Sequence, residues 1–162
     1  MKIYIMGSTG VGKTYLSKKL SKKYNVKTYE LDKIVYDQEN LSVHRSDKEI
    51  EKSFNEIISK DDWIIEDIGR KRFKRGREKC DKIYYIKKSK FKTYKQMIKR
   101  WNKQRKGLED YNIKPTFKSL FKQLNDVRLY KKLEKGLLKE LKVYEDKLII
   151  INKTDNKSLE NF

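Results

Sequence analysis

Eight consecutive residues near the start of the chain have the types and the spacing that binding of a phosphate group requires. Residues 7–14 match the pattern G-x-x-x-x-G-K-[ST]. Glycines let the backbone point successive N–H groups inward, which forms a nest for an anion. We therefore expect the phosphates of a nucleoside triphosphate to be bound by Gly7, Ser8, Thr9, Gly10, Val11, Gly12, Lys13 and Thr14.

Two side chains at the end of this loop add charge and metal chemistry. The Lys13 ammonium can reach the β- and γ-phosphates, and the Thr14 hydroxyl can ligate Mg²⁺. An apolar stretch precedes the loop at residues 2–6, and an amphipathic helix is expected over residues 13–24. The N-terminus of such a helix carries a partial positive charge that favours phosphate. The expected cofactors are therefore ATP, or another nucleoside triphosphate, and Mg²⁺.

Strand-like and helix-like segments alternate along the whole chain, which indicates a parallel sheet covered on both faces. Short apolar runs predict the strands, and the segments between them carry apolar side chains at helical spacing. No internal repeat or low-complexity linker divides the chain, so we expect one α/β domain over residues 1–162. The predicted strands are residues 2–6, 26–31, 63–66, 83–86 and 148–151.

Local signals mark where the expected helices begin and end. Ser46 and Glu49 have the spacing of a capping box, which opens a helix. Residues 69–79 are basic and contain glycines, which is typical of a loop or a short helix. Residues 107–115 are expected to form a loop between two longer helices. The buried sides of these two helices are expected to carry Phe91, Tyr94, Ile98 and Trp101, and Leu120, Phe121, Leu124, Val127, Leu133, Leu137 and Leu141.

The composition restricts the function less than the loop does. The 162 residues carry a formal charge of +19 and a pI near 9.8, which attracts nucleic acid and the phosphates of small nucleotides alike. The lysines are spread along the chain, so nucleic-acid binding remains open but is not favoured. A single cysteine excludes an internal disulfide, and no apolar run is long enough to span a membrane. We expect a cytoplasmic protein, either a monomer or a dimer.

The phosphate loop and four later stretches together resemble the nucleoside monophosphate kinase and shikimate kinase branch of P-loop proteins. The closest resemblance is to the bacterial, adenylate-kinase-like "topology modulation protein" group. The stretches that carry it are residues 1–14, 29–32, 63–66, 99–101 and 148–151. The resemblance implies a three-layer α/β/α P-loop fold with a five-stranded parallel sheet of order 2-3-1-4-5 and a helical lid at about residues 100–128. It also implies transfer of the γ-phosphoryl group of ATP to a small acceptor, such as a nucleoside monophosphate.

The same resemblance implies roles for side chains at the ends of the second and third strands. It places Glu66 on a water of the Mg²⁺ shell, with Asp67 as the alternative one position later. Asp32 would face the acceptor hydroxyl as a general base or an orienting group, and Glu30 would support a Mg²⁺ water. Arg70 would bind the acceptor or its phosphate, because a guanidinium fits a phosphate bidentately.

Further basic residues complete the implied site. Arg45 is expected near the acceptor, and Arg100, Arg105 and Arg128 on the lid would stabilise the charge that develops on the transferred group. Residues 152–154 follow the last strand, where relatives contact adenine through backbone groups.

The chain also departs from this family pattern. Tyr15 is counted among the expected nucleotide-binding positions, although relatives carry there a small hydroxyl residue that helps to hold the α-phosphate. No proline precedes Arg70, and residues 107–115 contain no four-cysteine zinc lid, so a strict adenylate kinase is not expected. We interpret His44 as a solvated loop residue and Cys80 as a packed small apolar residue.

Two classes of function follow from these observations. The first is a small-molecule kinase whose acceptor the sequence does not identify. The alternative is a nucleotide-binding regulatory or DNA-associated protein with little or no kinase activity.

Overall fold

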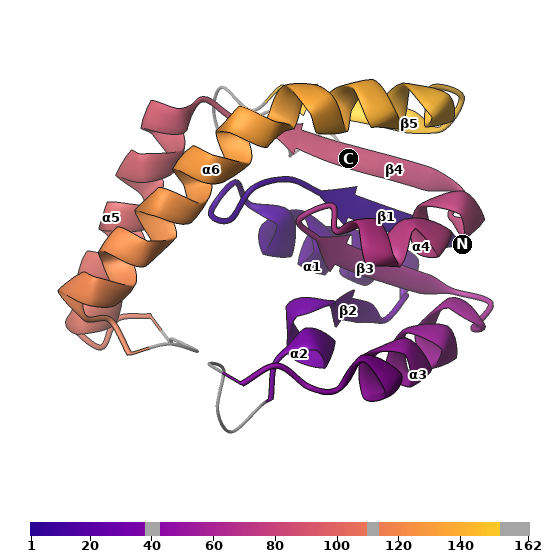
Figure 1. Cartoon of the computed structure of the whole chain (residues 1–162), viewed down its shortest axis with the longest axis horizontal. Helices are drawn as coiled ribbons and strands as arrows, with labels where there is room; N and C mark the ends of the chain where they lie inside the picture. The colour runs from indigo at the N-terminus through magenta and orange to yellow at the C-terminus, as the bar shows by residue number, and fades with distance from the viewer. Residues whose placement is uncertain (38–42, 110–113, 153–162) are drawn as a thin grey trace.

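A single parallel sheet organises the structure, which is a computed structural model describing residues 1–37, 43–109 and 114–152. Its five strands lie in the order β2-β3-β1-β4-β5, and every neighbouring pair is parallel (Figure 1). The predicted order is therefore confirmed. The strands are β1 (Lys2–Met6), β2 (Thr28–Glu30), β3 (Trp63–Asp67), β4 (Lys82–Lys87) and β5 (Leu148–Asn152).

The central strand β1 is apolar on both faces because both faces are covered. Tyr4 and Met6 are buried in one hydrophobic core, whereas Ile3 and Ile5 are buried in a second core on the opposite side. Alternate residues of a strand point to opposite faces, so a strand in the middle of a two-sided sheet reads as a continuous apolar run.

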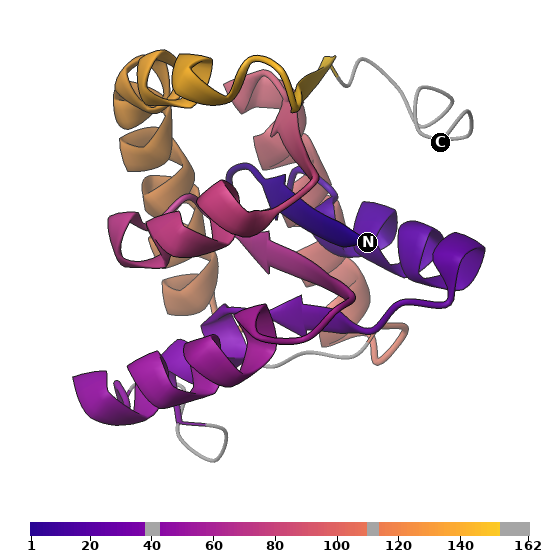
Figure 2. The same ribbon diagram turned by 90° about the vertical axis from the view of Figure 1, so that its right-hand side faces the viewer.

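Helices form the two outer layers of the fold. In the view along the sheet, α1 lies on one side, and α3, α4 and the end of α6 lie on the other (Figure 2). This arrangement confirms the expected α/β/α layers. The helices are α1 (Lys13–Tyr24), α2 (Asp32–Val35), α3 (Asp47–Ile58), α4 (Lys74–Lys79), α5 (Lys90–Arg105) and α6 (Phe117–Leu141), with 3₁₀ turns η1 (Lys71–Phe73) and η2 (Lys142–Tyr144).

Polar side chains cap α3, for which a capping box was predicted, and also α5 and α6, for which no cap was predicted. Ser46 accepts from the Glu49 amide while the Glu49 carboxylate accepts from the Ser46 amide, so the predicted capping box is present. Ser89 caps α5 and Thr116 caps α6 in the same manner, each accepting from an amide three residues later. These caps satisfy amides that no helical carbonyl can reach.

The helices α5 and α6 pack against each other beyond the carboxyl ends of the strands (Figure 1). The Trp101 indole N–H donates to the Thr116 carbonyl over 3.1 Å, and its ring lies 4.9 Å from that of Phe117. The contact joins the end of α5 to the start of α6. The pair therefore stands next to the edge of the sheet where the phosphate loop emerges.

The predicted buried side of α5 was wrong in part: Trp101 is buried as predicted, but Phe91 and Ile98 are exposed. Thr93, Met97 and Trp101 are buried, whereas Phe91 is 77% exposed and Ile98 is 41% exposed. The physical reason is that α5 packs through Thr93 and Met97 against the phosphate loop, at Gly10. Hydrophobicity alone favoured the side that carries Phe91.

The prediction for α6 was also wrong in part. Leu120, Val127 and Leu141 are buried, but Phe121 and Leu133 are 68% and 71% exposed. The helix has 25 residues, and its first part lies beyond the sheet beside α5. A helix that packs against one other helix buries only a narrow stripe of its own surface.

The second strand is shorter than predicted, because β2 covers only Thr28–Glu30 and α2 begins at Asp32. Asp32 therefore belongs to the first turn of a short helix rather than to the end of a strand. Lys153 and Thr154 lie outside the described residues, as do residues 38–42 and residues 110–113 of the predicted 107–115 loop. Within the described ranges, none of the helices has the length and apolar character that crossing a membrane requires.

Candidate functional site

The loop between β1 and α1 can be built only with glycine at its key positions. Gly7, Gly10 and Gly12 have φ values of 147°, 75° and 105°. A Cβ at Gly7 would lie 2.8 Å from the Ile86 carbonyl oxygen, and a Cβ at Gly10 would lie 2.8 Å from Cγ of Met97. The loop is thus held tightly between β4 and α5 in a conformation that other residues rarely adopt.

Lys13 places its ammonium across this loop. Its Nζ donates to the carbonyl oxygens of Gly7 and Ser8 over 3.0 and 3.1 Å. Burial lowers the pKa of Lys13, although the charges of Glu66 and Asp32 oppose that effect. The lysine is therefore a largely desolvated cation at the mouth of the loop.

One buried polar group of the loop lacks a hydrogen-bond partner within the described part of the chain. The Ser8 hydroxyl is buried and has no hydrogen-bond partner there. The N-cap of α1, Gly12, provides no side-chain acceptor, and the first turn of α1 carries no acidic residue. A buried donor without a partner is costly, and an anion at a helix N-terminus would satisfy such donors. These residues therefore fit the phosphates of a nucleotide.

Glu66 lies directly beside the loop and accepts hydrogen bonds from two hydroxyl groups of α1. The Thr14 Oγ1 donates to its Oε2 and the Ser17 Oγ donates to its Oε1, both over 2.9 Å. Burial raises the pKa of Glu66, and the two hydrogen bonds counteract part of this effect. The arrangement unites a hydroxyl and a carboxylate, the oxygen ligands that Mg²⁺ and its water shell prefer.

Asp67 points to the opposite face of the sheet and holds Arg70. Its Oδ1 accepts from Nη1 of Arg70 over 2.5 Å, and its Oδ2 accepts from the Gly69 and Arg70 amides over 2.7 Å. The Tyr4 hydroxyl also donates a hydrogen bond to Oδ2 of Asp67 over 3.2 Å. Asp67 is buried, so its charge is compensated by hydrogen bonds and by the guanidinium.

Arg70 joins Asp67 to Asp32, because its Nη2 donates to the Asp32 Oδ1. Burial disfavours the charged guanidinium, but Asp67 and Asp32 outweigh this effect and raise the pKa of Arg70. The side chain of Arg70 is 18% exposed, whereas that of Asp32 is 62% exposed. An open carboxylate thus lies next to a fixed cation, in the same neighbourhood as Lys13.

The other predicted arginines lie apart from this cluster. Arg45 lies 3.8 Å from Glu49, and Nε of Arg100 lies 3.0 Å from Glu109. Arg105 stacks on the rings of Trp101 and Phe117, and Arg128 is exposed on α6. The structure therefore brings Lys13, Thr14, Asp32, Glu66 and Arg70 together, but it does not bring these four arginines to them.

The remaining predicted positions have mixed surroundings. Glu30 pairs with Lys33 over 2.7 Å, and its charge also acts on Glu66. Tyr15 is 54% exposed, and Asn152 ends β5. His44 is exposed and lies beside the ring of Tyr36, whereas Cys80 is buried with its pKa raised to about 12 by burial. Cys80 therefore has the packed environment expected from the sequence.

The sequence reasoning missed Ser17, which shares Glu66 with Thr14. Residues three apart lie on the same face of a helix, so the position of Thr14 could have indicated it. It also missed Tyr85 on β4, whose hydroxyl donates to Glu134 over 2.9 Å, while Lys131 pairs with Glu134 over 2.6 Å. No local signal connects residues this far apart. In the described ranges, no group of three or more His, Cys, Asp or Glu side chains could hold a metal by itself.

Comparison with known proteins relates this architecture to solved structures. No protein-family model and no curated protein matches the sequence. Shikimate kinase from Bacteroides thetaiotaomicron superposes with a TM-score of 0.58 and 17% identity, covering 99% of this chain and 93% of that one. Shikimate kinase from Aquifex aeolicus gives a TM-score of 0.45 and 16% identity, with coverages of 85% and 99%. A gluconokinase from Sinorhizobium meliloti gives 0.45 and 15%, with coverages of 83% and 96%. At these identities the likeness is one of fold, and the chain has the five-stranded P-loop kinase fold.

Proposed function

We propose that the chain is an ATP- and Mg²⁺-dependent phosphotransferase that transfers the γ-phosphoryl group to a small acceptor, of which a nucleoside monophosphate is one class to test. The observation that carries the proposal is the convergence of three groups at one edge of the sheet. These groups are the Lys13 ammonium across the glycine loop, the Thr14–Glu66 pair and the Arg70–Asp32 pair.

The nucleotide half of the site consists of residues 7–14. Loop amides and the Ser8 hydroxyl would hold the phosphates, and Lys13 would neutralise the β- and γ-oxygens. Thr14 would ligate Mg²⁺ directly and Glu66 would act through a bound water. When bound, Mg·ATP supplies the transferable phosphoryl group and charge neutralisation on its oxygens.

The acceptor half consists of Asp32 and Arg70, with Arg45 on the neighbouring segment. Asp67 fixes the Arg70 guanidinium, so a phosphate or carboxylate on the acceptor would meet a preorganised cation. The open Asp32 carboxylate would orient the acceptor hydroxyl or take its proton. This division requires no side chain to serve both substrates.

The α5–α6 pair would act as the lid of a single domain spanning the chain. Arg100, Arg105 and Arg128 stand on this pair at the carboxyl edge of the sheet, outside the cluster in this conformation. Closure would carry a guanidinium to the oxygens of the transferred group, where it stabilises negative charge.

An acceptor screen with a loop variant tests the proposal. ATP consumption is measured with Mg²⁺ against a panel of nucleoside monophosphates, nucleosides and small hydroxy acids. For any acceptor that gives turnover, Lys13→Ala is expected to lower kcat/KM by about 100-fold or more, because it removes charge stabilisation in the transition state. Lys18→Ala, an exposed lysine on the same helix, is the matched control and should leave turnover unchanged. Equal turnover in Lys13→Ala with an intact circular dichroism spectrum would rule the kinase out.

The net charge of +19 favours one rival, a nucleic-acid-associated nucleotide-binding protein. This rival predicts tight binding of DNA or RNA that weakens with a steep slope of log affinity against log salt. Filter binding from about 50 to 200 mM salt separates the two classes. Affinity that persists at the upper salt concentration, without ATP turnover on any acceptor, would favour the rival.

A further inference from the structure

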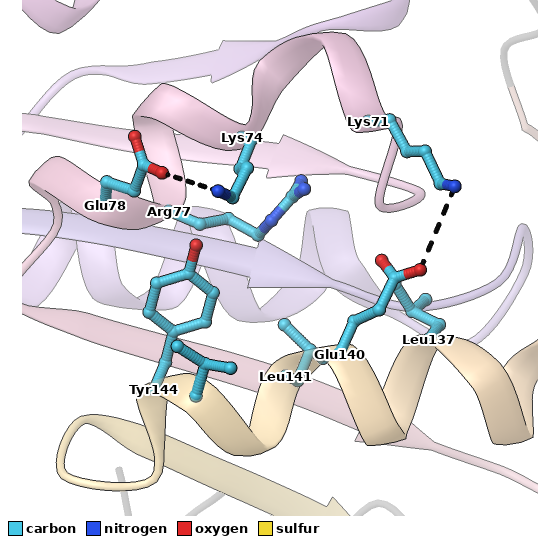
Figure 3. A pocket seen from close by; sticks show the side chains of 9 residues that line it. Lys71, Lys74, Arg77, Glu78, Leu137, Glu140, Leu141 and Tyr144 are labelled. Carbon is cyan, nitrogen blue, oxygen red and sulfur yellow. Dashed lines mark ion pairs between the residues drawn. The ribbon is translucent and has the colours of Figure 1, made fainter.

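A second concave site lies between α4 and the end of α6, separate from the phosphate loop. Figure 3 shows this groove, which has a volume of about 550 Å³. Three cations line it from one side and three apolar or aromatic side chains from the other. They are Lys71, Lys74 and Arg77, and Leu137, Leu141 and Tyr144.

Arg77 is the unusual member of this lining because it is a buried charge. The residue is only 4% exposed, and none of the described carboxylates forms an ion pair with it. Its Nη1 donates to the Arg70 carbonyl over 3.0 Å, and its guanidinium lies over the Tyr4 ring. A guanidinium carries five N–H donors, and Arg77 also interacts with the Tyr4 hydroxyl, but both of these partners are neutral.

The carboxylates in the groove are already engaged with other cations. Glu78 pairs with Lys74 over 3.0 Å, and Glu140 lies 4.0 Å from Lys71, as the dashed lines in Figure 3 mark. Arg77 lies between these two pairs in the same view. Burial of an uncompensated charge is costly, and an opposite charge in contact with it recovers that cost.

We propose that this groove binds a small organic oxyanion, whose carboxylate or phosphate pairs with Arg77 and whose apolar body packs against Leu137, Leu141 and Tyr144. The mixed lining fits such a ligand, since binding sites combine apolar walls with a few polar groups that fix orientation. The site stands independently of the proposed kinase activity. It also lies one hydrogen bond from the backbone of Arg70.

A titration followed by NMR of the leucine methyl groups tests the site directly. Phenylacetate and phenyl phosphate are the charged probes, and phenylacetamide is the neutral analogue. Both charged probes should shift the methyl signals of Leu137 and Leu141, with an affinity about tenfold or more above that of phenylacetamide. The tighter of the two identifies the preferred head group. Equal affinity for the neutral analogue, or no shift at millimolar probe, would overturn the proposal.

Variants localise the effect to the cations of the groove. Arg77→Gln is expected to weaken phenylacetate binding about tenfold. Because that variant removes a buried side chain and could unfold the protein, the double variant Lys71→Gln/Lys74→Gln serves beside it. Both lysine side chains are exposed, at 89% and 66%. The double variant should weaken binding about threefold.

The matched control is Lys48→Gln/Lys52→Gln on α3, which removes the same charge from exposed positions outside the groove. It should bind phenylacetate as the unaltered chain does. An equal loss in the control would assign the effect to net charge and reject the site. Probe-induced shifts confined to the methyl signals of Leu16 on α1, the helix that begins at the phosphate loop, would reject it as well.

Discussion

The hydroxyl of Thr14 donates a hydrogen bond of 2.9 Å to the carboxylate of Glu66, across a separation of 52 residues. The sheet creates this contact, because β1 and β3 are parallel neighbours and Ile5 stands in register with Glu66. The carboxyl end of β3 therefore meets the start of α1, where the phosphate loop ends. A carboxylate that is buried, and held by two hydroxyls, is well placed to bind the water shell of a cation.

The stability of the chain should depend on the charge of Glu66. Burial raises the pKa of Glu66 in the folded state, in spite of the hydrogen bonds from Ser17 and Thr14. The folded state then binds a proton more readily than the unfolded chain, so stability falls as pH rises above the unfolded value of about 4.3. Glu66→Gln cannot titrate and should not lose this contribution. In urea unfolding from pH 4 to 8, the free energy of unfolding of Glu66→Gln should increase relative to that of the unaltered chain as pH rises.

The same variant should bind Mg·ATP more weakly even where it is more stable. Loss of an outer-shell metal partner costs about 10- to 100-fold in affinity or activity. Glu51→Gln, which removes a carboxylate of α3 that is paired with Arg75, is the control. A pH-independent stability difference between Glu66→Gln and the unaltered chain would contradict the linkage, and unchanged Mg²⁺ dependence would contradict the metal role.

Asp67→Asn should destabilise the fold strongly. The carboxylate is buried and accepts from the Tyr4 hydroxyl, the Gly69 amide, and the amide and guanidinium of Arg70. Removing one partner of a buried ion pair costs about 3–5 kcal/mol. Equilibrium urea denaturation measures the loss, with Asp61→Asn, an exposed carboxylate on the turn before β3, as the control. A loss of unfolding free energy as small as that of the control would show that the stability of the fold does not require the Asp67 charge.

Two glycine substitutions should change stability in opposite directions. Gly7→Ala adds a Cβ 2.8 Å from the Ile86 carbonyl oxygen at a φ of 147°, and should cost about 1–3 kcal/mol. Gly136→Ala adds a methyl group in open space within α6, and should stabilise the chain by about 0.5–1 kcal/mol. Thermal unfolding of both variants checks the pair. Destabilisation by Gly136→Ala would show that α6 is not helical at that point.

The lid arginines should separate into catalytic and structural groups. Arg128 is exposed on α6, so Arg128→Ala should lower kcat with little loss of stability if lid closure brings it to the transferred phosphoryl group. Arg105 lies 4.8 Å from the centroid of the Trp101 ring and 5.3 Å from that of Phe117. Arg105→Ala should therefore cost about 1 kcal/mol of stability in addition to any effect on rate. Steady-state kinetics together with denaturation separates the two effects, and an Arg128→Ala enzyme with unchanged kcat would remove that residue from the mechanism.

Several features were predictable because their signals are local. The glycine spacing of residues 7–14 requires a loop with special backbone angles, and Gly7, Gly10 and Gly12 adopt them. The capping box at Ser46 is equally local, since both partners lie within one helical turn. The order of the strands came from the resemblance to known kinases, because the apolar runs alone are compatible with other orders.

The sequence by itself determined the five strand segments, most of the helices and the glycine loop of residues 7–14, since backbone angles and periodicity act over a few residues. Only the tertiary structure decided that Glu66, and not its neighbour Asp67, faces Thr14. Consecutive strand residues point to opposite faces, so this choice depends on which face α1 covers. Tertiary packing likewise determines which side of α5 is buried, so that Met97 lies against Gly10 of the loop. It also buries Arg77 beside the groove. Such contacts join residues that are distant in the chain, and no short pattern encodes them.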